Sequence, residues 1–342
     1  MGRGRACLVL KGNEYQIHPR FVKAISQSLK SLDLDITIFK TDDAPSYGFG
    51  SIYRRARWLL AKLNEIEDDQ SPNLYLILAP LNLVPNRIAN KSIAYINNIH
   101  ERDHYLNKKR SPYYWLYSYL LYTRGIQHVK LVLTNSIYSK TIMEDIVRGD
   151  IRELYIPTRI YDKNLDTKRE DWVCFLGRIH PSKLFEEILQ VSTLIPDIQF
   201  HLIGRVLEGD EAYYKSLRNI GGPNVHWHIN ASEVEKDRVL FTSKVFLDRM
   251  CTGGITTSFP TAVSAGLLPV CHVSSPHHIE GFSYGKSWET PEDAATLIRS
   301  AMKDWSVELC QKQRERFREL YSQEKLERDL VSVIREGGFI DG

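Results

Sequence analysis

Short runs of apolar, largely β-branched residues alternate with longer segments of helical periodicity along most of the chain. In the first half the runs predict buried strands, and the segments between them predict helices. The predicted strands are 6–10, 36–39, 74–78, 92–96 and 131–134, and the predicted helices are 19–32, 52–66, 113–122 and 139–147. Such alternation is typical of a largely parallel sheet that is covered by helices on both faces.

A polar segment with a proline, residues 155–171, interrupts this pattern and suits a linker between domains. A second series of strands and helices then begins at Trp172. Its predicted strands are 173–176, 199–203, 226–228, 245–247 and 268–272, its predicted helices are 182–194, 211–219, 233–242, 260–265 and 291–303, and a charged helical tail covers 307–335. We therefore predict an α/β protein of two facing Rossmann-like domains with a cleft between them.

Composition narrows the class of protein further. The 342 residues are 43% hydrophobic and 25% charged, with a formal net charge of +3, which is ordinary for a globular protein of two domains and too weakly basic to indicate nucleic acid. No apolar stretch is long enough to span a bilayer, and the run 6–10 is too short for a signal-peptide core. The five cysteines are scattered and form no C-x-x-C pair, which fits a reducing compartment. We expect a cytoplasmic protein.

The first candidate for chemistry follows the first strand of the second series. That strand runs into Gly177, the chain turns through Pro181, and we predict that Ser182 caps the next helix. Arg178 and Lys183 would then lie near the carboxyl end of a strand and near a helix N-terminus, where doubly wound sheets bind ligands and anions. A guanidinium and an ammonium there would suit a diphosphate, and the alternative is two cations on an ordinary surface turn.

A loop rich in glycine and threonine forms the second candidate and follows the predicted strand 245–247. Glycine lets a ligand approach the backbone, so the amides of 254–257 would suit a phosphate or a sugar. A short helix with Pro260 in its first turn comes next. The alternative is a packing loop without a ligand, but its place at the crevice end of a strand favours a ligand.

Several segments resemble the retaining glycosyltransferase family 4, whose architecture is called GT-B. The matching segments are Leu-Gly-Arg-Ile-His-Pro-Ser-Lys at 176–183, His-Leu-Ile-Gly at 201–204, Asn-Val-His-Trp at 224–227, the run 246–270, and more weakly 95–100, 132–140 and 155–157. The resemblance covers nearly the whole chain. It implies an acceptor-binding domain at 1–157, a linker at 158–171, a nucleotide-sugar-binding domain at 172–318, and a helix at 319–342 that packs back toward the first domain.

The resemblance also implies an activity. A sugar would move from a nucleoside diphosphate donor to a glycan or lipid-linked acceptor with retention of configuration, and no cofactor, divalent metal or nucleic acid would take part. His100, Arg178 and Lys183 would be catalytic, although a histidine at a strand end is equally often structural. The implied donor-binding residues are Gly12, Gly177, Arg178, Lys183, Ile229, Asn230, Gly253, Gly254, Ile255, Thr256, Thr257 and Thr261.

Two positions depart from the family pattern. The family usually carries two glutamates in the loop and helix of the second domain, one on the donor sugar and one on the ribose, and here those positions hold Gly253 and Thr261. A threonine hydroxyl has no charge, and the loss of a charge-assisted hydrogen bond weakens binding by about 1.5–3 kcal/mol. The alternative reading is therefore a catalytically inactive, glycosyltransferase-like binding protein.

Three further signals are weaker. Basic residues flank a tyrosine-rich segment at 107–124, which suits peripheral contact with a membrane, and the alternative is that its aromatic side chains face a core. Asp33-Leu-Asp35 matches a D-x-D pattern, but it lies between a predicted helix and a strand, so we expect no metal there. Adjacent histidines seldom converge on one ion, so we expect His277 and His278 in a donor-contacting loop.

Overall fold

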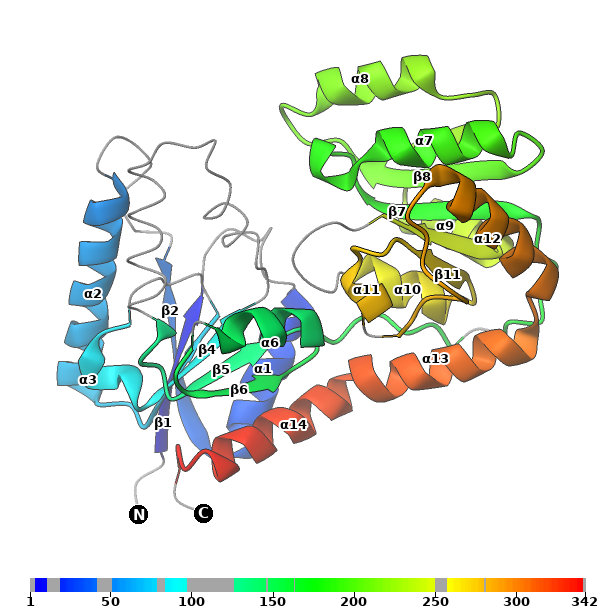
Figure 1. The fold of residues 1–342 in the computed structure, drawn as a ribbon. Helices are drawn as coiled ribbons and strands as arrows, with labels where there is room; N and C mark the ends of the chain where they lie inside the picture. Colours follow the sequence, from blue (N-terminus) through cyan, green and yellow to red (C-terminus); the bar gives the residue numbers. More distant parts are fainter. Residues whose placement is uncertain are drawn as a thin grey trace. The chain divides into compact units, whose positions relative to one another are not determined.

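The chain forms two compact units, each built on a parallel sheet (Figure 1). Unit 1 comprises Met1–Pro157 and Gln323–Gly342, and unit 2 comprises Thr158–Ser322. The computed structural model describes residues 4–10, 19–41, 51–78, 84–96, 126–145, 147–162, 164–249, 257–279 and 281–340. The two parallel sheets with flanking helices confirm the predicted α/β class.

Unit 1 contains a sheet whose described strands run in the order β2-β1-β3-β4-β5-β6, all parallel. These strands are β1 (Gly4–Leu10), β2 (Leu34–Lys40), β3 (Leu74–Ile77), β4 (Ser92–Ile96), β5 (Leu131–Thr134) and β6 (Asp150–Glu153). Successive side chains of a strand point to opposite faces, so Leu8 packs with the helices of one face and Val9 with those of the other. Helices α1 (Pro19–Ser31) and α14 (Gln323–Glu336) cover the first face, and α2 (Ser51–Gln70), α3 (Asn86–Ala89) and α6 (Ile137–Glu144) cover the second.

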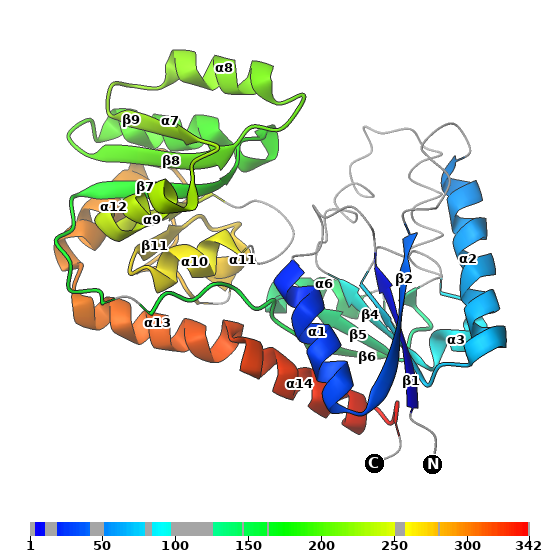
Figure 2. The same cartoon turned by 180° about the vertical axis from the view of Figure 1, so that it is seen from behind.

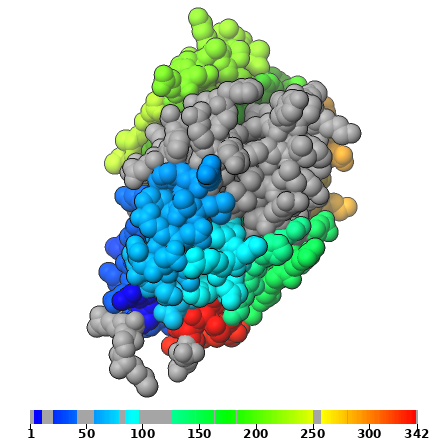
Figure 3. Space-filling model, turned by 90° about the vertical axis from the view of Figure 1, so that its left-hand side faces the viewer, coloured from blue at the N-terminus to red at the C-terminus, as the bar shows by residue number. Residues whose placement is uncertain are grey.

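Helices α2 and α3 lie side by side on the face of unit 1 that Figure 3 shows. Arg87 and Asp68 join them through an ion pair of 2.7 Å, but both side chains are more than half exposed. Because exposed pairs contribute little to stability, we attribute the packing of these helices to the buried side chains of Leu63 and Ile88.

Unit 2 contains a sheet whose described strands run in the order β11-β10-β7-β8-β9, again all parallel. The strands are β7 (Trp172–Arg178), β8 (Gln199–Arg205), β9 (Val225–Ile229), β10 (Val245–Asp248) and β11 (Leu268–Cys271). The helices are α7 (Phe185–Leu194), α8 (Glu211–Ile220), α9 (Glu233–Thr242), α10 (Ser258–Ser264), α11 (Pro276–Ile279), α12 (Pro291–Asp304) and α13 (Val307–Tyr321). One face packs with α7 and α12, and Figure 2 presents the other face, with α9 and α10.

The strand order of unit 2 contains a reversal. The chain runs outward from β7 through β8 to β9 and then returns to place β10 on the other side of β7. Connections therefore leave the adjacent strands β7 and β10 in opposite directions. Open α/β sheets bind ligands at such a switch point, outside the carboxyl ends of the strands.

Segment 158–171, predicted as a linker, packs in unit 2. Tyr161, Leu165 and Arg169 are buried. The guanidinium of Arg169 donates to the carbonyl oxygens of Ser243 (2.6 Å) and Ala265 (2.5 Å), and burial lowers its pKa to about 10. The segment therefore joins the end of α9 to the end of α10.

The charged tail predicted as one helix is two helices. Helix α13 ends at Tyr321, Ser322 is extended with ψ 156°, and α14 begins at Gln323. Helix α14 packs on α1 and buries Leu326, Leu330 and Ile334 in the core of unit 1.

In the described part of the chain no helix is both long enough and apolar enough to cross a membrane.

Candidate functional site

Charged residues gather at the carboxyl ends of the strands that flank the switch point of unit 2. Gly177 and Arg178 end β7, and Asp248 ends β10 and is followed by Arg249. Lys183 is the last residue of a short 3-10 turn, Pro181–Lys183, that follows β7. The structure thus brings the two predicted cations, Arg178 and Lys183, to the edge of the sheet where a ligand is expected.

Arg178 is held by an acidic neighbour. Its Nε and Nη2 atoms both donate to Oδ2 of Asp210, at 3.0 and 2.7 Å. The Asp210 side chain is 10% exposed and that of Arg178 is 46% exposed, so the carboxylate is enclosed while the guanidinium still reaches solvent. This ion pair fixes the direction of Arg178 and offsets part of its charge.

The charge of Lys183 helps to lower the pKa of Asp248, the last residue of β10. Burial by itself would raise the pKa of Asp248, but His277, the Ser275 hydroxyl and the charge of Lys183 together hold that pKa below its ordinary value. Nδ1 of His277 lies 2.7 Å from Oδ2 of Asp248. Asp248 therefore stays ionised inside the unit and places a negative charge near Lys183.

The turn between β7 and α7 differs from the prediction. Helix α7 begins at Phe185 rather than at Ser182, and its N-cap is Leu184, whose φ of 47° lies in the left-handed region and which makes no side-chain capping bond. The 3-10 turn that contains Lys183 comes between the strand and the helix. The predicted Ser182 cap is wrong because the chain tightens into this turn before the α-helix starts.

Arg249, the residue after β10, is buried and bound in place. Its Nε and Nη2 atoms donate to the two carboxylate oxygens of Glu187, at 2.5 and 3.0 Å, and its guanidinium lies over the Trp288 ring. Only 7% of its side chain is exposed. A bidentate pair of this kind joins β10 to the first turn of α7 and leaves Arg249 little freedom to reach a ligand.

The predicted nucleobase residues follow the neighbouring strand β9. Ile229 is half-buried, and Asn230 is exposed with a φ of 53° and donates its amide to the carbonyl oxygen of Gly204 at 2.8 Å. The chain then enters α9, whose N-cap Ser232 accepts from the amide of Glu235 at 3.2 Å. Asn230 tolerates this left-handed conformation better than most residues, so the turn after β9 is sharp.

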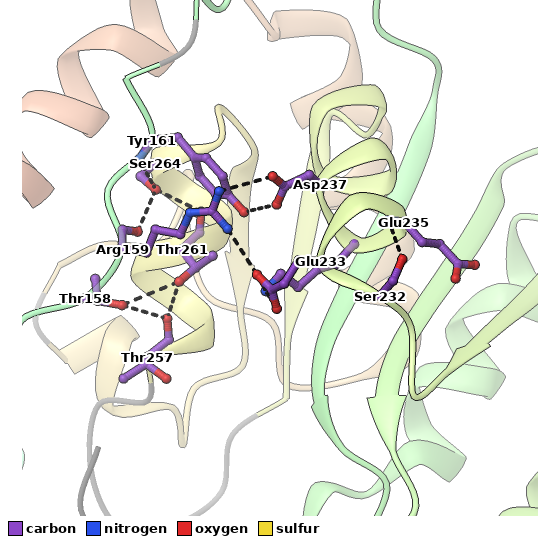
Figure 4. Close-up of polar contacts among 11 residues, drawn as sticks. Thr158, Arg159, Tyr161, Ser232, Glu233, Glu235, Asp237, Thr257, Thr261 and Ser264 are labelled. Atoms are coloured by element: carbon purple, nitrogen blue, oxygen red, sulfur yellow. Dashed lines mark hydrogen bonds and ion pairs between the residues drawn. The ribbon is translucent and has the colours of Figure 1, made fainter. Parts of the chain in front are cut away.

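Thr261 uses its hydroxyl within its own helix. Its Oγ1 donates to the carbonyl oxygen of Thr257 at 2.7 Å, and the hydroxyl of Thr158 also reaches that oxygen, at 3.2 Å (Figure 4). The two threonine hydroxyls lie 3.4 Å apart, and Thr261 is buried. The hydroxyl proton of Thr261 is thus already used in a hydrogen bond, so this hydroxyl can only accept a further hydrogen bond from a ligand.

Acidic residues of α9 hold the segment before β7. Arg159 donates to Glu233 at 3.0 Å and to Asp237 at 3.2 Å, and the hydroxyl of Tyr161 also bonds Asp237 (Figure 4). Glu233 remains 67% exposed, whereas Asp237 is 16% exposed. These contacts fix the start of unit 2 against α9, close to the Thr158 and Thr261 hydroxyls.

The histidine pair at 277–278 has a different role from the one predicted. His277 is fully buried and its ring stacks on Phe259 with centroids 3.7 Å apart. The expectation of a donor-contacting loop is wrong for His277, because its ring completes the core beneath β10. Among the residues that the structure describes, no group of three or more metal-binding side chains is arranged to hold an ion.

The remaining predicted site residues belong to segments between the described ranges. His100, Gly12 and the loop residues Gly253, Gly254, Ile255 and Thr256 lie outside the described residues, as does the tyrosine-rich segment 107–124. Gly177, Arg178, Lys183, Ile229, Asn230, Thr257 and Thr261 are described, and all belong to unit 2.

One cation at the strand ends, Arg205, was not predicted from the sequence. Arg205 ends β8 and lies directly opposite Arg178 in the parallel register of β7 and β8. A signal was present in the sequence, because Leu-Gly-Arg at 176–178 is nearly repeated as Ile-Gly-Arg at 203–205. Both tripeptides end an apolar strand, so adjacent parallel strands bring the two arginines together.

These features define a fold of two parallel α/β sheets, each in its own unit, and that fold is the GT-B architecture. Sucrose-phosphate synthase from Thermosynechococcus elongatus matches with a TM-score of 0.74 at 12% identity, over 98% of this chain and 99% of that one. A glycosyltransferase from Rickettsia africae matches with a TM-score of 0.69 at 11% identity, over 98% and 99% of the two chains.

A third similar structure was solved with ligands. HepE of Anabaena, in complex with UDP and glucose, matches with a TM-score of 0.62 at 13% identity, over 97% of this chain and 100% of that one. No protein-family model matches the chain, and no curated protein matches it in sequence. At these identities the likeness establishes the fold, and function has to be argued from the site.

Proposed function

We propose that this protein is a glycosyltransferase that moves a sugar from a nucleoside diphosphate donor to a glycan or lipid-linked acceptor, with retention of configuration. Unit 2 binds the donor, with the diphosphate on Arg178 and Lys183 and the nucleobase beside Ile229 and Asn230. Unit 1 binds the acceptor.

The observation that carries this proposal is the set of cations at the switch point of unit 2. Arg178 and Lys183 come from the end of β7 and the turn after it, beside the carboxyl end of β10. Buried Asp210 holds Arg178 in place through two hydrogen bonds, and ionised Asp248 places a negative charge near Lys183. Fixed cations at a crevice suit a leaving group whose negative charge grows during the reaction.

We propose the following course for the reaction. The bond between the anomeric carbon and the diphosphate oxygen breaks, and the electron pair leaves with the diphosphate, which Arg178 and Lys183 stabilise. The acceptor hydroxyl forms the new bond on the same face of the sugar, and its proton passes to the departing phosphate oxygen. The sugar stays in an oxocarbenium-like state between these events, so no carboxylate nucleophile is required.

We further propose that the reaction needs no metal or cofactor and takes place in the cytoplasm. Because cations of the protein offset the diphosphate charge, the reaction requires no divalent metal and no cofactor. The protein works in the cytoplasm, with the tyrosine-rich segment 107–124 in peripheral contact with a membrane where the acceptor is lipid-linked. His100 approaches the transferring sugar.

A second function is favoured by Thr261. Its hydroxyl is committed to the carbonyl oxygen of Thr257, and Arg178 is partly neutralised by Asp210. A site with those features would hold a nucleotide without the contacts that drive turnover. The alternative is therefore a catalytically inactive, glycosyltransferase-like protein that binds a nucleotide or a glycan.

A paired binding and turnover screen tests both functions. Wild-type protein and an Arg178→Ala/Lys183→Ala variant would be incubated with UDP-, GDP- and ADP-sugars, while thermal shift and nucleotide release are measured. Stabilisation together with release, in the wild type alone, supports the enzyme and identifies its donor. Stabilisation without release, even with glycan and lipid acceptors added, supports the binding protein.

The stereochemistry needs its own measurement. Proton NMR of the glycoside product gives its anomeric configuration from the coupling of the anomeric proton, and a glycoside does not mutarotate. A product with the configuration of the donor supports retention, and the opposite configuration rules it out. A wild type that responds to no nucleotide sugar would contradict the donor site itself.

A further inference from the structure

Strands β7 and β8 end with matching sequences. Leu-Gly-Arg occupies 176–178 and Ile-Gly-Arg occupies 203–205, and the register of the two parallel strands sets Arg178 opposite Arg205. Residues in register on neighbouring parallel strands project to the same side of a sheet. The two arginines therefore leave adjacent strand ends from the same side.

The glycine before Arg205 keeps these two strand ends close. A Cβ atom on Gly204 would lie 2.7 Å from the carbonyl oxygen of Gly177 and 2.7 Å from Cγ1 of Ile179. Any larger residue at 204 would push β8 away from β7. The amide of Ile179 also donates to the carbonyl oxygen of Arg205 at 2.9 Å, so the backbone of Arg205 is fixed in the ladder.

The two guanidinium groups differ in their partners. Arg178 directs two nitrogens at the enclosed carboxylate of Asp210. Arg205 is exposed, and it forms no ion pair with the residues that the structure describes. A cation that is already paired with a carboxylate attracts an anion less strongly than an unpaired one does.

We propose that Arg205 is the main cation for the anionic ligand of this site, and that Asp210 restrains Arg178 to a secondary role. The anionic ligand that we propose for this site is a diphosphate. The identification of the natural ligand as a nucleoside diphosphate rests on the proposed function, but the presence of the anion site does not. Lys183 completes the set from the turn after β7.

Calorimetric titration with pyrophosphate, and then with UDP, GDP and ADP, measures this site directly. Arg205→Ala should weaken pyrophosphate binding by about tenfold or more, since a charged hydrogen bond is lost, and Arg178→Ala should weaken it less. Arg218→Ala is the matched control, because it removes an exposed arginine of the same unit that donates to the Tyr214 hydroxyl on α8. It should bind pyrophosphate as the wild type does.

A second variant tests the restraint on Arg178. Asp210→Asn frees the guanidinium and should tighten pyrophosphate binding several-fold, and the same change should have no such effect in an Arg178→Ala background. Asp210 is the N-cap of α8, but its side chain makes no capping hydrogen bond, so the helix keeps its start. Thermal unfolding measures whether each variant is folded. Arg205→Gln removes the same charge as Arg205→Ala but keeps a longer side chain than alanine.

The outcomes separate this proposal from the proposed function. If both Arg205 variants fold and bind pyrophosphate as Arg218→Ala does, Arg205 is not the main cation, whatever the enzyme does. If pyrophosphate binds in an Arg205-dependent manner but no nucleoside diphosphate binds, the anion site stands and the proposed donor fails. If the wild type binds neither, both are wrong.

Discussion

Nδ1 of His277 lies 2.7 Å from Oδ2 of Asp248, and the two side chains are almost completely buried. The hydroxyl of Ser275 donates to the same carboxylate oxygen at 2.5 Å. This arrangement places an ionised group directly beneath the switch point. The carboxyl end of β10 is thereby tied to α11, so the floor of the candidate site is fixed by a buried hydrogen-bonded pair.

We expect Asp248→Asn to destabilise the protein by about 1.5–3 kcal/mol, because a neutral amide makes weaker hydrogen bonds with His277 and Ser275 than an ionised carboxylate does. Chemical denaturation followed by tryptophan fluorescence measures this loss. The pKa of Asp248 is lowered in the folded protein, so its contribution is complete above a pH of about 4, the unfolded value, and is lost as the pH falls further.

Asp197→Asn is the control for that prediction. Asp197 pairs with Arg299, but both side chains are more than half exposed, and such pairs contribute little. The control should unfold near the wild-type midpoint. Equal loss from both variants would mean that the buried pair has no special role.

The fold class was predictable because the buried strands are continuous apolar runs. Residues 245–247 and 268–272 are examples, since a parallel sheet covered on both faces requires such runs. Strand β6, Asp150–Glu153, was missed because an edge strand bears charged residues that read as a loop. The break of the tail at Ser322 was missed because helical periodicity continues on both sides of it.

The candidate site was predictable only in part. Arg178 and Lys183 follow a strand within the sequence, so local order reveals them. Asp210 and Arg205 reach the same place through the pairing of β7 with β8, which no local pattern reports. His277 depends on packing against Phe259, and sequence alone does not distinguish a buried histidine from an exposed one.

Acid should destabilise unit 2 through His201. Burial, followed by the charges of His226, His228 and Arg238, lowers the pKa of His201 to about 3. The unfolded chain, with a pKa near 6.5, binds more protons than the folded protein between these values. Stability should therefore fall as the pH drops below about 6.5, by up to about 1.4 kcal/mol per pH unit for this residue.

Denaturation at several pH values from 5.0 to 7.5 measures this slope. His201→Gln should reduce it, because glutamine does not titrate and can still contact Nε2 of His228, which now lies 2.9 Å from Nδ1 of His201. The control is His128→Gln, a change at an exposed histidine of unit 1, whereas His201 belongs to unit 2. An unchanged slope in His201→Gln would show that another group takes up the proton.

Removal of divalent metal should leave nucleotide-sugar turnover unchanged. Arg178, Lys183 and Arg205 supply fixed positive charge where a metal would otherwise offset the diphosphate. Initial rates in a chelator, compared with rates in added magnesium or manganese, measure this directly. Activity that is lost in the chelator and restored by one of the metals would contradict a metal-independent reaction.

Gly266→Ala should destabilise unit 2 more than the same change at Gly209. Both glycines have a left-handed φ, 94° and 90°, so each substitution incurs a backbone cost of about 1–2 kcal/mol. A Cβ atom on Gly266 would also lie 2.6 Å from Leu165 and 2.7 Å from Arg169, whereas one on Gly209 meets nothing within 4 Å. The crowding should add about 1–3 kcal/mol at Gly266.

The difference between these two variants isolates the packing of segment 158–171. Their shared backbone conformation cancels in the comparison of denaturation free energies, and the contacts with Leu165 and Arg169 remain. Equal losses would mean that the segment yields to the new methyl group, and that the bonds from Arg169 to the carbonyl oxygens of Ser243 and Ala265 do not hold it in place. A larger loss at Gly266 would show that the start of unit 2 is a fixed part of its core.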